Sequence, residues 1–217
     1  EFRRVLFRSG GTVNLGGGSD TLTVTGTNSL ALSGVETVLG SSGNDTVTFT
    51  TVQSGISVDL GDGADTLSLA AGTNTLALSG IELVTTSGTN NDTLTLTGAF
   101  TGGTIDLGLG TDALNLANAT NVVFVTGVET ITGGTGDDAI TLSAAGTVTA
   151  SLGLGTDILT LGAAGTSSLT LSGVETLVGS SGNDTVTFTS VQSGISVDLG
   201  GGTADTLTLT EIGRAHV

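Results

Sequence analysis

The fold is decided by two neighbouring stretches, 35–50 (VETVLGSSGNDTVTFT) and 58–69 (VDLGDGADTLSL). Both consist of a short alternation of apolar and polar residues, a Gly-rich turn, an Asp and a second alternation. Alternation with a period of two indicates strands with one buried face, and the glycines between them indicate turns. These stretches therefore predict short β-strands, and no part of the chain shows a helical periodicity.

Both stretches belong to one unit of an internal repeat. The phrase Gly-Val-Glu-Thr recurs at 34–37, 127–130 and 173–176, with Gly80-Ile81-Glu82 as a variant, so the period is 46 to 47 residues. We expect an all-β parallel solenoid, a β-helix or β-roll, with three short strands in each coil of about 23 residues and a double coil in each 46-residue repeat. At about 4.8 Å per coil, about nine coils would form a rod about 40 Å long.

Packing in these strands follows from the alternation, because successive side chains point to opposite faces. One face should stack into apolar rows in a thin core. The residues expected to point inward are Val47, Phe49, Val58, Leu60, Leu67, Leu69, Leu94, Leu96, Val186 and Phe188.

The two ends of the chain differ from the repeat. All four Arg and the single His lie in residues 1–9 and 211–217. Residues 3–9 and 211–217 can be encoded by strings that are reverse complements over about twenty nucleotides, as in a sequencing adapter read through at both ends. We expect 1–9 and 211–217 to be adapter-derived scars, and 10–210 to be a solenoid repeat domain taken from a longer array.

The composition of residues 10–210 restricts the classes of partner. This part has no Lys, Arg, His, Cys, Pro, Met, Trp or Tyr, and it holds eighteen of the twenty acidic residues. Such a negative field disfavours nucleic acid and anionic membrane surfaces, and no apolar run is long enough to insert into a membrane. Without Cys there is no disulfide framework. Metal cations are the natural partners.

An Asp follows each Gly-rich turn. If the coils stack in register, nine carboxylates form a column about 4.8 Å apart, and neighbours repel by about 1 kcal/mol in water. Solvation, protonation or cations between the loops must offset this repulsion, and hard oxygen ligands favour Ca²⁺. The predicted calcium ligands are Asp20, Asp45, Asp65, Asp92, Asp112, Asp138, Asp157, Asp184 and Asp205, with Asp137 and with Gly43, Gly63, Gly110, Gly136 and Gly182, whose positive φ would aim carbonyls at the ion.

Residues 133–141 (GGTGDDAIT) fit the nonapeptide Gly-Gly-x-Gly-x-Asp-x-apolar-x in full, and 40–48 and 179–187 lack only the second Gly. The repeat thus resembles the repeats-in-toxin (RTX) proteins. This resemblance implies Ca²⁺ held between successive coils by loop Asp side chains and carbonyls, and export before folding in extracellular calcium. Here the motifs stand about 23 residues apart rather than in tandem, and the loops before Asp92 and Asp205 depart from the pattern. The alternative is an acidic corner that binds ions only diffusely.

A second acidic row runs through the predicted strands. Its side chains should point outward, because their sequence neighbours point inward. A solvated face is the simplest interpretation, and a second cation row or a partner-binding face is the alternative. The row consists of Glu36, Asp59, Glu82, Asp106, Glu129, Glu175 and Asp198.

The function that these features favour is structural. Residues 10–210 offer no side chain but carboxylates and hydroxyls for catalysis, so we expect no enzyme. We expect a calcium-binding stalk or spacer of a secreted or cell-surface, adhesin-like bacterial protein, which contacts neighbouring repeats and can associate end to end through unpaired strand edges. Outward Thr rows such as Thr46, Thr48 and Thr50 resemble ice-binding solenoids, so an ice- or flat-surface-binding face is an alternative. A carbohydrate-active β-helix fragment is a second alternative, which the scarcity of aromatic residues disfavours.

Overall fold

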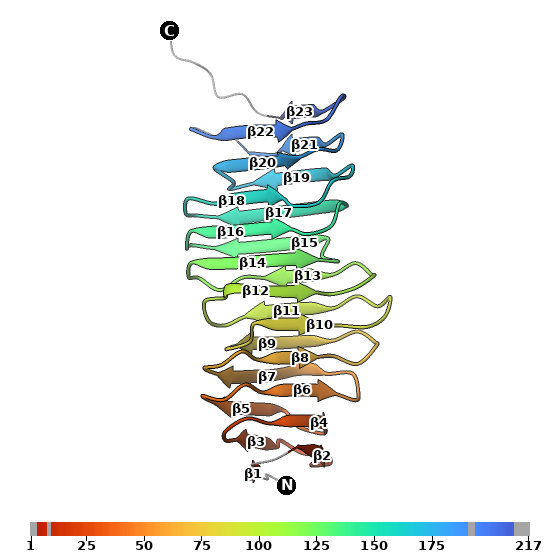
Figure 1. The fold of residues 1–217 in the computed structure, drawn as a ribbon, viewed down its shortest axis with the longest axis vertical. Coiled ribbons are helices and arrows are strands. Elements are labelled where there is room, and N and C mark those ends of the chain that lie inside the picture. The colour runs from red at the N-terminus through yellow and green to blue at the C-terminus, as the bar shows by residue number, and fades with distance from the viewer. Residues whose placement is uncertain (1–3, 8–9, 191–193, 211–217) are drawn as a thin grey trace.

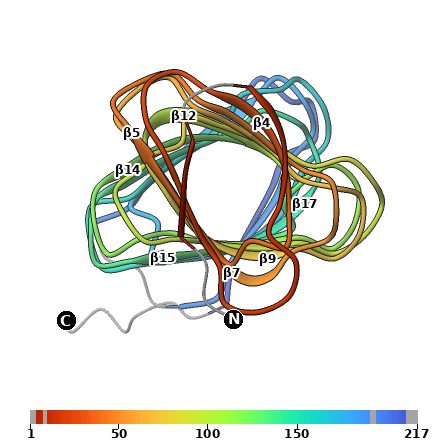
Figure 2. The same ribbon diagram turned by 90° about the horizontal axis from the view of Figure 1, so that it is seen from below.

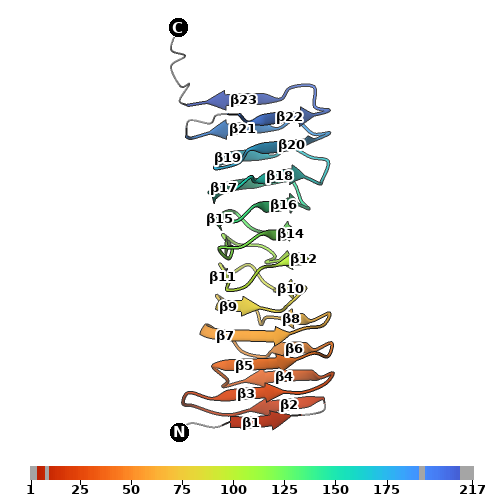
Figure 3. The same ribbon diagram turned by 90° about the vertical axis from the view of Figure 1, so that its left-hand side faces the viewer.

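The computed structural model describes residues 4–7, 10–190 and 194–210. The chain forms a parallel β-solenoid of about ten turns, with β1 and β23 at opposite ends of the rod (Figures 1 and 3). Each turn contributes one strand to sheet A and one to sheet B, and every strand pairs in parallel with the strand two places along the chain. The described residues contain no helix, and so none that could cross a membrane.

The two sheets run the full height of the rod. Sheet A consists of β1 (Arg4–Phe7), β3 (Thr21–Val24), β5 (Thr37–Ser41), β7 (Ser54–Gly61), β9 (Thr75–Ser79), β11 (Thr93–Leu96), β13 (Ala113–Asn115), β15 (Thr130–Gly134), β17 (Thr147–Gly153), β19 (Ser168–Ser172), β21 (Thr185–Phe188) and β23 (Thr206–Leu209). Sheet B consists of β2 (Gly11–Asn14), β4 (Ser29–Ser33), β6 (Thr46–Phe49), β8 (Thr66–Ser68), β10 (Leu83–Thr85), β12 (Thr101–Asp106), β14 (Asn121–Thr126), β16 (Asp138–Leu142), β18 (Ile158–Leu161), β20 (Thr176–Ser180) and β22 (Ser196–Gly200).

The predicted solenoid is confirmed, but its coil is smaller than expected. Residues that pair in register on neighbouring turns are 16 to 21 residues apart in the chain, with about 19 in a typical turn. Thr21 and Thr37 show the shortest spacing, and Thr185 and Thr206 show the longest. A turn holds two strands rather than three, because the predicted third strand, such as 75–78, belongs to the next turn. Twelve strands at about 4.8 Å make the rod about 53 Å tall, longer than the predicted 40 Å.

The sequence repeat covers two and a half turns, not two. The strand that follows the Gly-x-Glu motif is β5, then β10, then β15, then β20, so each repeat advances by five strands. Successive repeats therefore present the same motif on opposite sides of the solenoid. Figure 2, seen along the axis, shows the yellow loops on one side and the green to teal loops on the other.

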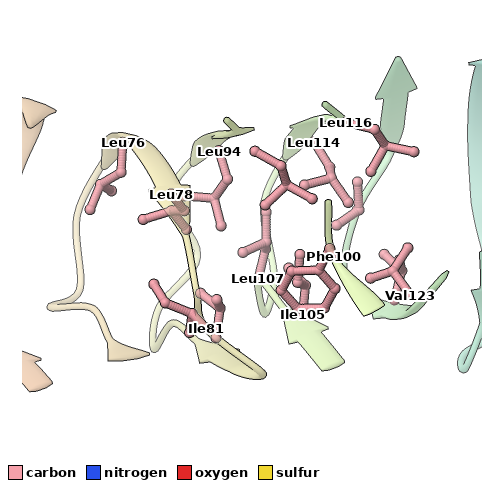
Figure 4. Packing of buried hydrophobic residues seen from close by; sticks show 14 of the residues in the cluster. Leu76, Leu78, Ile81, Leu94, Phe100, Ile105, Leu107, Leu114, Leu116 and Val123 are labelled. Carbon is pink, nitrogen blue, oxygen red and sulfur yellow. The ribbon is translucent and has the colours of Figure 1, made fainter. Parts of the chain in front are cut away.

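The core follows the predicted alternation. All ten side chains expected to point inward are at most 4% exposed. They stack between the sheets with their equivalents from other turns, as Leu76, Leu94 and Leu114 do in Figure 4. Each turn buries only a few apolar side chains, so stability depends on contacts between neighbouring turns.

The segments interpreted as scars are only partly described. Residues 1–3, 8–9 and 211–217 lie outside the described residues. Residues 4–7 form β1 and pair in parallel with β3. The adapter origin of these segments stays a prediction.

Candidate functional site

The nine predicted Asp lie on two corners of the solenoid. Corner A is the set of connections that lead from sheet B to sheet A, and corner B is the set that leads from sheet A to sheet B. Corner A holds Asp20, Asp92, Asp112, Asp184 and Asp205, and corner B holds Asp45, Asp65, Asp138 and Asp157. The single column that we expected is wrong, because the repeat of two and a half turns places successive Asp pairs on opposite sides.

On each corner, side chains of successive turns form short polar groups, which we call corner rows. A complete row reads Asn, Asp, Asp, Glu over four turns. The rows are Asn28, Asp45, Asp65 and Glu82 on corner B; Asn74, Asp92, Asp112 and Glu129 on corner A; and Asn121, Asp138, Asp157 and Glu175 on corner B. Partial rows on corner A are Asp20 with Glu36, and Ser167 with Asp184 and Asp205.

Each row is held together by bonds between backbone and side chain. In the first row, the backbone N–H of Asn28 donates to Asp45 Oδ1 at 2.8 Å, and that of Asp45 donates to Asp65 Oδ1 at 2.7 Å. The N–H of Asp65 donates to Glu82 Oε2 at 2.7 Å. These N–H groups turn away from the sheets at the corner, and a buried donor needs an acceptor. The carboxylate of the following turn supplies it through a charge-assisted bond.

Sequence reasoning missed the Asn at the foot of each row. Asn28 Nδ2 donates to the Gly26 carbonyl at 2.8 Å and to Asp45 Oδ1 at 3.0 Å, so one amide closes its own turn and binds the Asp above. Asn74 and Asn121 make the same bonds. The available signal was the spacing, since each Asn stands 17 or 18 residues before the first Asp of its row.

The predicted outward row of acids splits into two groups. The four Glu belong to the corners, where Glu36, Glu82, Glu129 and Glu175 each accept the N–H of an Asp at 2.7–2.9 Å, so their outward orientation was wrong. The Gly two residues before each Glu has φ of 58° to 61°, which turns the chain and ends the alternation. The acids Asp59, Asp106 and Asp198 lie on strands, and their Oδ1 atoms accept the N–H of the Gly two residues on.

Most corner Asp residues have one carboxylate oxygen without a hydrogen-bond partner. Asp45, Asp65, Asp112, Asp138 and Asp157 are at most 1% exposed, and their Oδ2 atoms are buried without a hydrogen-bond partner. Asp184 differs, since its Oδ2 accepts bonds from Ser180. Asp205 lies on the last described turn and is partly exposed.

Burial changes the acidity of these carboxyl groups. It raises the pKa of Asp65 and Asp157 to about 6, an effect opposed by the N–H of the Asp below and reinforced by the neighbouring Asp and Glu charges. Burial also raises the pKa of Asp112 and Asp138. The middle of each complete row therefore contains at least one carboxyl group that holds a proton more tightly than a free Asp side chain does.

The predicted loop glycines are needed for close stacking of the loops. Gly43, Gly136 and Gly182 do not have the positive φ that we expected. A Cβ on Gly43 would lie 2.6 Å from the Gly26 carbonyl carbon, and one on Gly136 would overlap Ala119. A Cβ on Gly63 would meet the Gly43 carbonyl, and a Cβ on Gly110 would meet the Asn90 carbonyl. A Cβ on Gly182 would meet the Gly165 carbonyl.

The remaining predicted ligand, Asp137, lies in an exposed loop. Its Oδ1 accepts the N–H of Thr156, in the loop one turn above, at 2.8 Å. Asn44, Asn91 and Asn183 cap the loops above them in the same way. Asp137 thus belongs to a series of loop caps.

The donors partly fit calcium. Stacked pairs such as Asp45 with Asp65 present two hard oxygens without hydrogen-bond partners. Within residues 4–7, 10–190 and 194–210, however, no three acidic, His or Cys side chains group so that they could hold a metal ion. Since calcium takes about 6–8 oxygen ligands, backbone carbonyls and water would have to complete the site.

Replacing Gly136 by Ala tests the stacking of the loops. We expect Gly136→Ala to lower stability by about 1–3 kcal/mol, because the new methyl group overlaps the loop below. Gly17→Ala is the control, since its Cβ would meet no atom within 4 Å. Thermal unfolding followed by circular dichroism measures the difference, and equal melting temperatures for the two variants would contradict it.

The raised pKa values predict a pH dependence of stability in EDTA. A carboxyl group with a raised pKa binds its proton more tightly in the folded state, so its stabilisation is complete below the unfolded pKa and is lost as pH rises through the folded pKa. The melting temperature should therefore fall between pH 3.8 and about 6. The double variant Asp65→Asn, Asp157→Asn should flatten this fall. Asp59→Asn, Asp198→Asn removes the same charge from exposed positions, and an equal flattening there would assign the effect to general charge repulsion.

Comparison with known proteins assigns no family to this geometry. No protein-family model, no curated protein and no solved structure matches the chain. The likeness to RTX proteins therefore rests on the nonapeptides, and the function must be argued from the fold and the corner rows.

Proposed function

We propose that this chain is a non-catalytic structural segment, a stalk or spacer, in which calcium neutralises the buried carboxylates of the corner rows. It would belong to a secreted or cell-surface protein of adhesin type. The observation that carries the proposal is the stacking of buried Asp pairs, with oxygens that lack partners, in a solenoid whose residues 10–210 contain no basic side chain.

The fold supports the structural part of the proposal. The same two strands recur from turn to turn, so length is gained by adding turns without changing the cross-section. Neighbouring repeats of a longer protein would continue the same sheets.

The corner rows support the calcium part. A buried carboxylate without a counter-charge destabilises the folded state, and a cation that binds only the folded state adds its binding free energy to stability. Folding would then be favoured outside the cell, because the resemblance to RTX proteins implies that the chain meets calcium after export.

Titration of the 217-residue chain with calcium tests this function. Far-UV circular dichroism and melting curves are recorded in EDTA, in millimolar Ca²⁺ and in Mg²⁺. A site at 100 times its Kd adds about 2.7 kcal/mol, so we expect calcium to raise the melting temperature by about 5–10 °C. Two double variants should lose this shift while they keep the Oδ1 acceptor. One is Asp45→Asn with Asp65→Asn, and the other is Asp138→Asn with Asp157→Asn.

The matched control is Asp59→Asn, Asp106→Asn, which removes two strand carboxylates outside the rows and should keep the shift. A complete β spectrum in EDTA, with a melting temperature that calcium does not change, would remove the calcium part. The solenoid would then depend on protons and hydrogen bonds at its corners.

The outer face of sheet A favours a second candidate, binding to ice or another flat ordered surface. One outward column, in register from β9 to β23, consists of Thr75, Thr93, Ala113, Thr130, Thr149, Thr170, Thr187 and Thr208. The column beside it includes Thr95, Asn115, Thr132, Ser151 and Ser172. The outward side chains of these strands carry no charge, and hydroxyls spaced about 4.8 Å apart across strands suit a periodic partner.

Thermal hysteresis and ice shaping test the second candidate. Thr149→Lys places a charge in the middle of the sheet A column and should abolish both effects. Thr48→Lys, at an exposed position on sheet B, should leave them intact. A wild-type protein with neither effect removes this candidate.

A further inference from the structure

One turn of the solenoid lacks a side chain that the equivalent turns bury in the core. Gln53, Phe100 and Gly146 occupy the same place, one turn below the foot of a corner row. The backbone pairing is the same at all three: Thr75 N donates to Gln53 O at 2.9 Å, Val122 N to Phe100 O at 2.6 Å, and Ser168 N to Gly146 O at 2.9 Å. The three residues thus share this bond, and their side chains differ.

The two larger residues are almost fully buried. Gln53 is 5% exposed and Phe100 is 6% exposed, and Figure 4 shows Phe100 among the core side chains. Gly146 contributes no such group, and a cavity of about 260 Å³ lies beside it. Its lining includes Leu109, Val125, Val128, Leu142, Val148 and Glu129.

The neighbouring strands do not close this cavity. In the first two repeats a glycine with positive φ, Gly55 or Gly102, forms an irregularity in β7 or β12 beside the buried side chain. The third repeat is one residue shorter here, since Phe100 precedes Asp106 by six residues whereas Gly146 precedes Ser151 by five. Residues 147–151 of β17 pair with β19 without a register shift.

The lining indicates the chemistry of a ligand. Most of the walls are apolar, and Leu109 is 69% exposed. Glu129 also lines the cavity, and one oxygen of its carboxylate accepts the Asp112 N–H at 2.8 Å. Residues 10–210 contain no basic side chain that could pair with it. The volume is below the usual range of about 300–1,000 Å³ for drug-sized ligands, so a smaller molecule fits.

We propose that the cavity beside Gly146 binds a small organic cation, with an apolar body about the size of a Phe side chain and an ammonium group that pairs with Glu129. The apolar body takes the place that Phe100 fills in the preceding repeat. Glu129 also belongs to the corner row of Asp92 and Asp112, so binding is measured both in EDTA and in calcium.

Isothermal titration calorimetry of the 217-residue chain tests the site with phenethylammonium as the probe. Phenylethanol lacks the charge and methylammonium lacks the apolar body. We expect saturable 1:1 binding of phenethylammonium, at least tenfold tighter than either of the other two compounds. Glu129→Gln keeps an oxygen acceptor for Asp112. This variant should lower the affinity for phenethylammonium about tenfold and leave the affinity for phenylethanol unchanged.

Filling the cavity provides the decisive variant. A Cβ on Gly146 would meet no atom within 4 Å, and Gly146 does not have a positive φ, so Gly146→Phe should fold and abolish binding. Gly17→Phe is the same substitution at an equally open glycine away from the cavity, and it should bind like wild type. Non-saturable binding, or equal binding by the Gly146→Phe and Gly17→Phe variants, would overturn the proposal, as would unchanged affinity in Glu129→Gln.

Discussion

Each corner row of this solenoid supplies side-chain acceptors for backbone N–H groups that the sheets do not pair. At the foot of a row, Asn74 and Asn121 supply this acceptor without a charge, and their amide groups also close their own turns. Asp and Glu on the turns above accept the same kind of N–H with a charged group, and this makes a stronger bond. The consequence is buried charge, because the same packing that requires the acceptor removes water from its second oxygen. The raised pKa values of Asp65 and Asp157 therefore arise from backbone geometry.

The repeat of two and a half turns limits the accumulation of this charge. With a whole number of turns per repeat, the acidic motif would recur on one side of the rod. Within the described residues, alternation between corners A and B instead gives stacks of at most three acidic side chains, and uncharged residues such as Gln53 and Asn74 on corner A separate one stack from the next. Since like charges one strand apart repel by about 1 kcal/mol even in water, and by more when buried, this spacing favours the folded state.

Local patterns in the sequence predicted local structure well. Alternation correctly placed Phe49, Leu67 and Phe188 inside, and the repeat indicated a parallel solenoid. The number of strands per turn could not be obtained in this way, because both half-repeats look alike and only the pairing register shows that they lie on different sheets. Glu36 was misplaced for a related reason. The period of two holds along a strand, but Gly34 turns the chain at φ 59°, so the next residues follow the geometry of a corner. The foot residues Asn28 and Asn74 were missed because their partners lie a full turn away in the chain.

The differences between repeats show where this architecture can change. The Gly146 carbonyl accepts a backbone N–H from the turn above as the Phe100 carbonyl does, although Gly146 has no large buried side chain and its connection is one residue shorter. In a solenoid each turn contacts only its neighbours, so the structural effect of such a loss stays local. The row residues are more constrained, because removal of one acceptor leaves the N–H of the turn below buried and without a partner. New binding properties are therefore expected at the corner positions between rows, because the sheets continue there with different side chains. The cavity beside Gly146 lies at such a position.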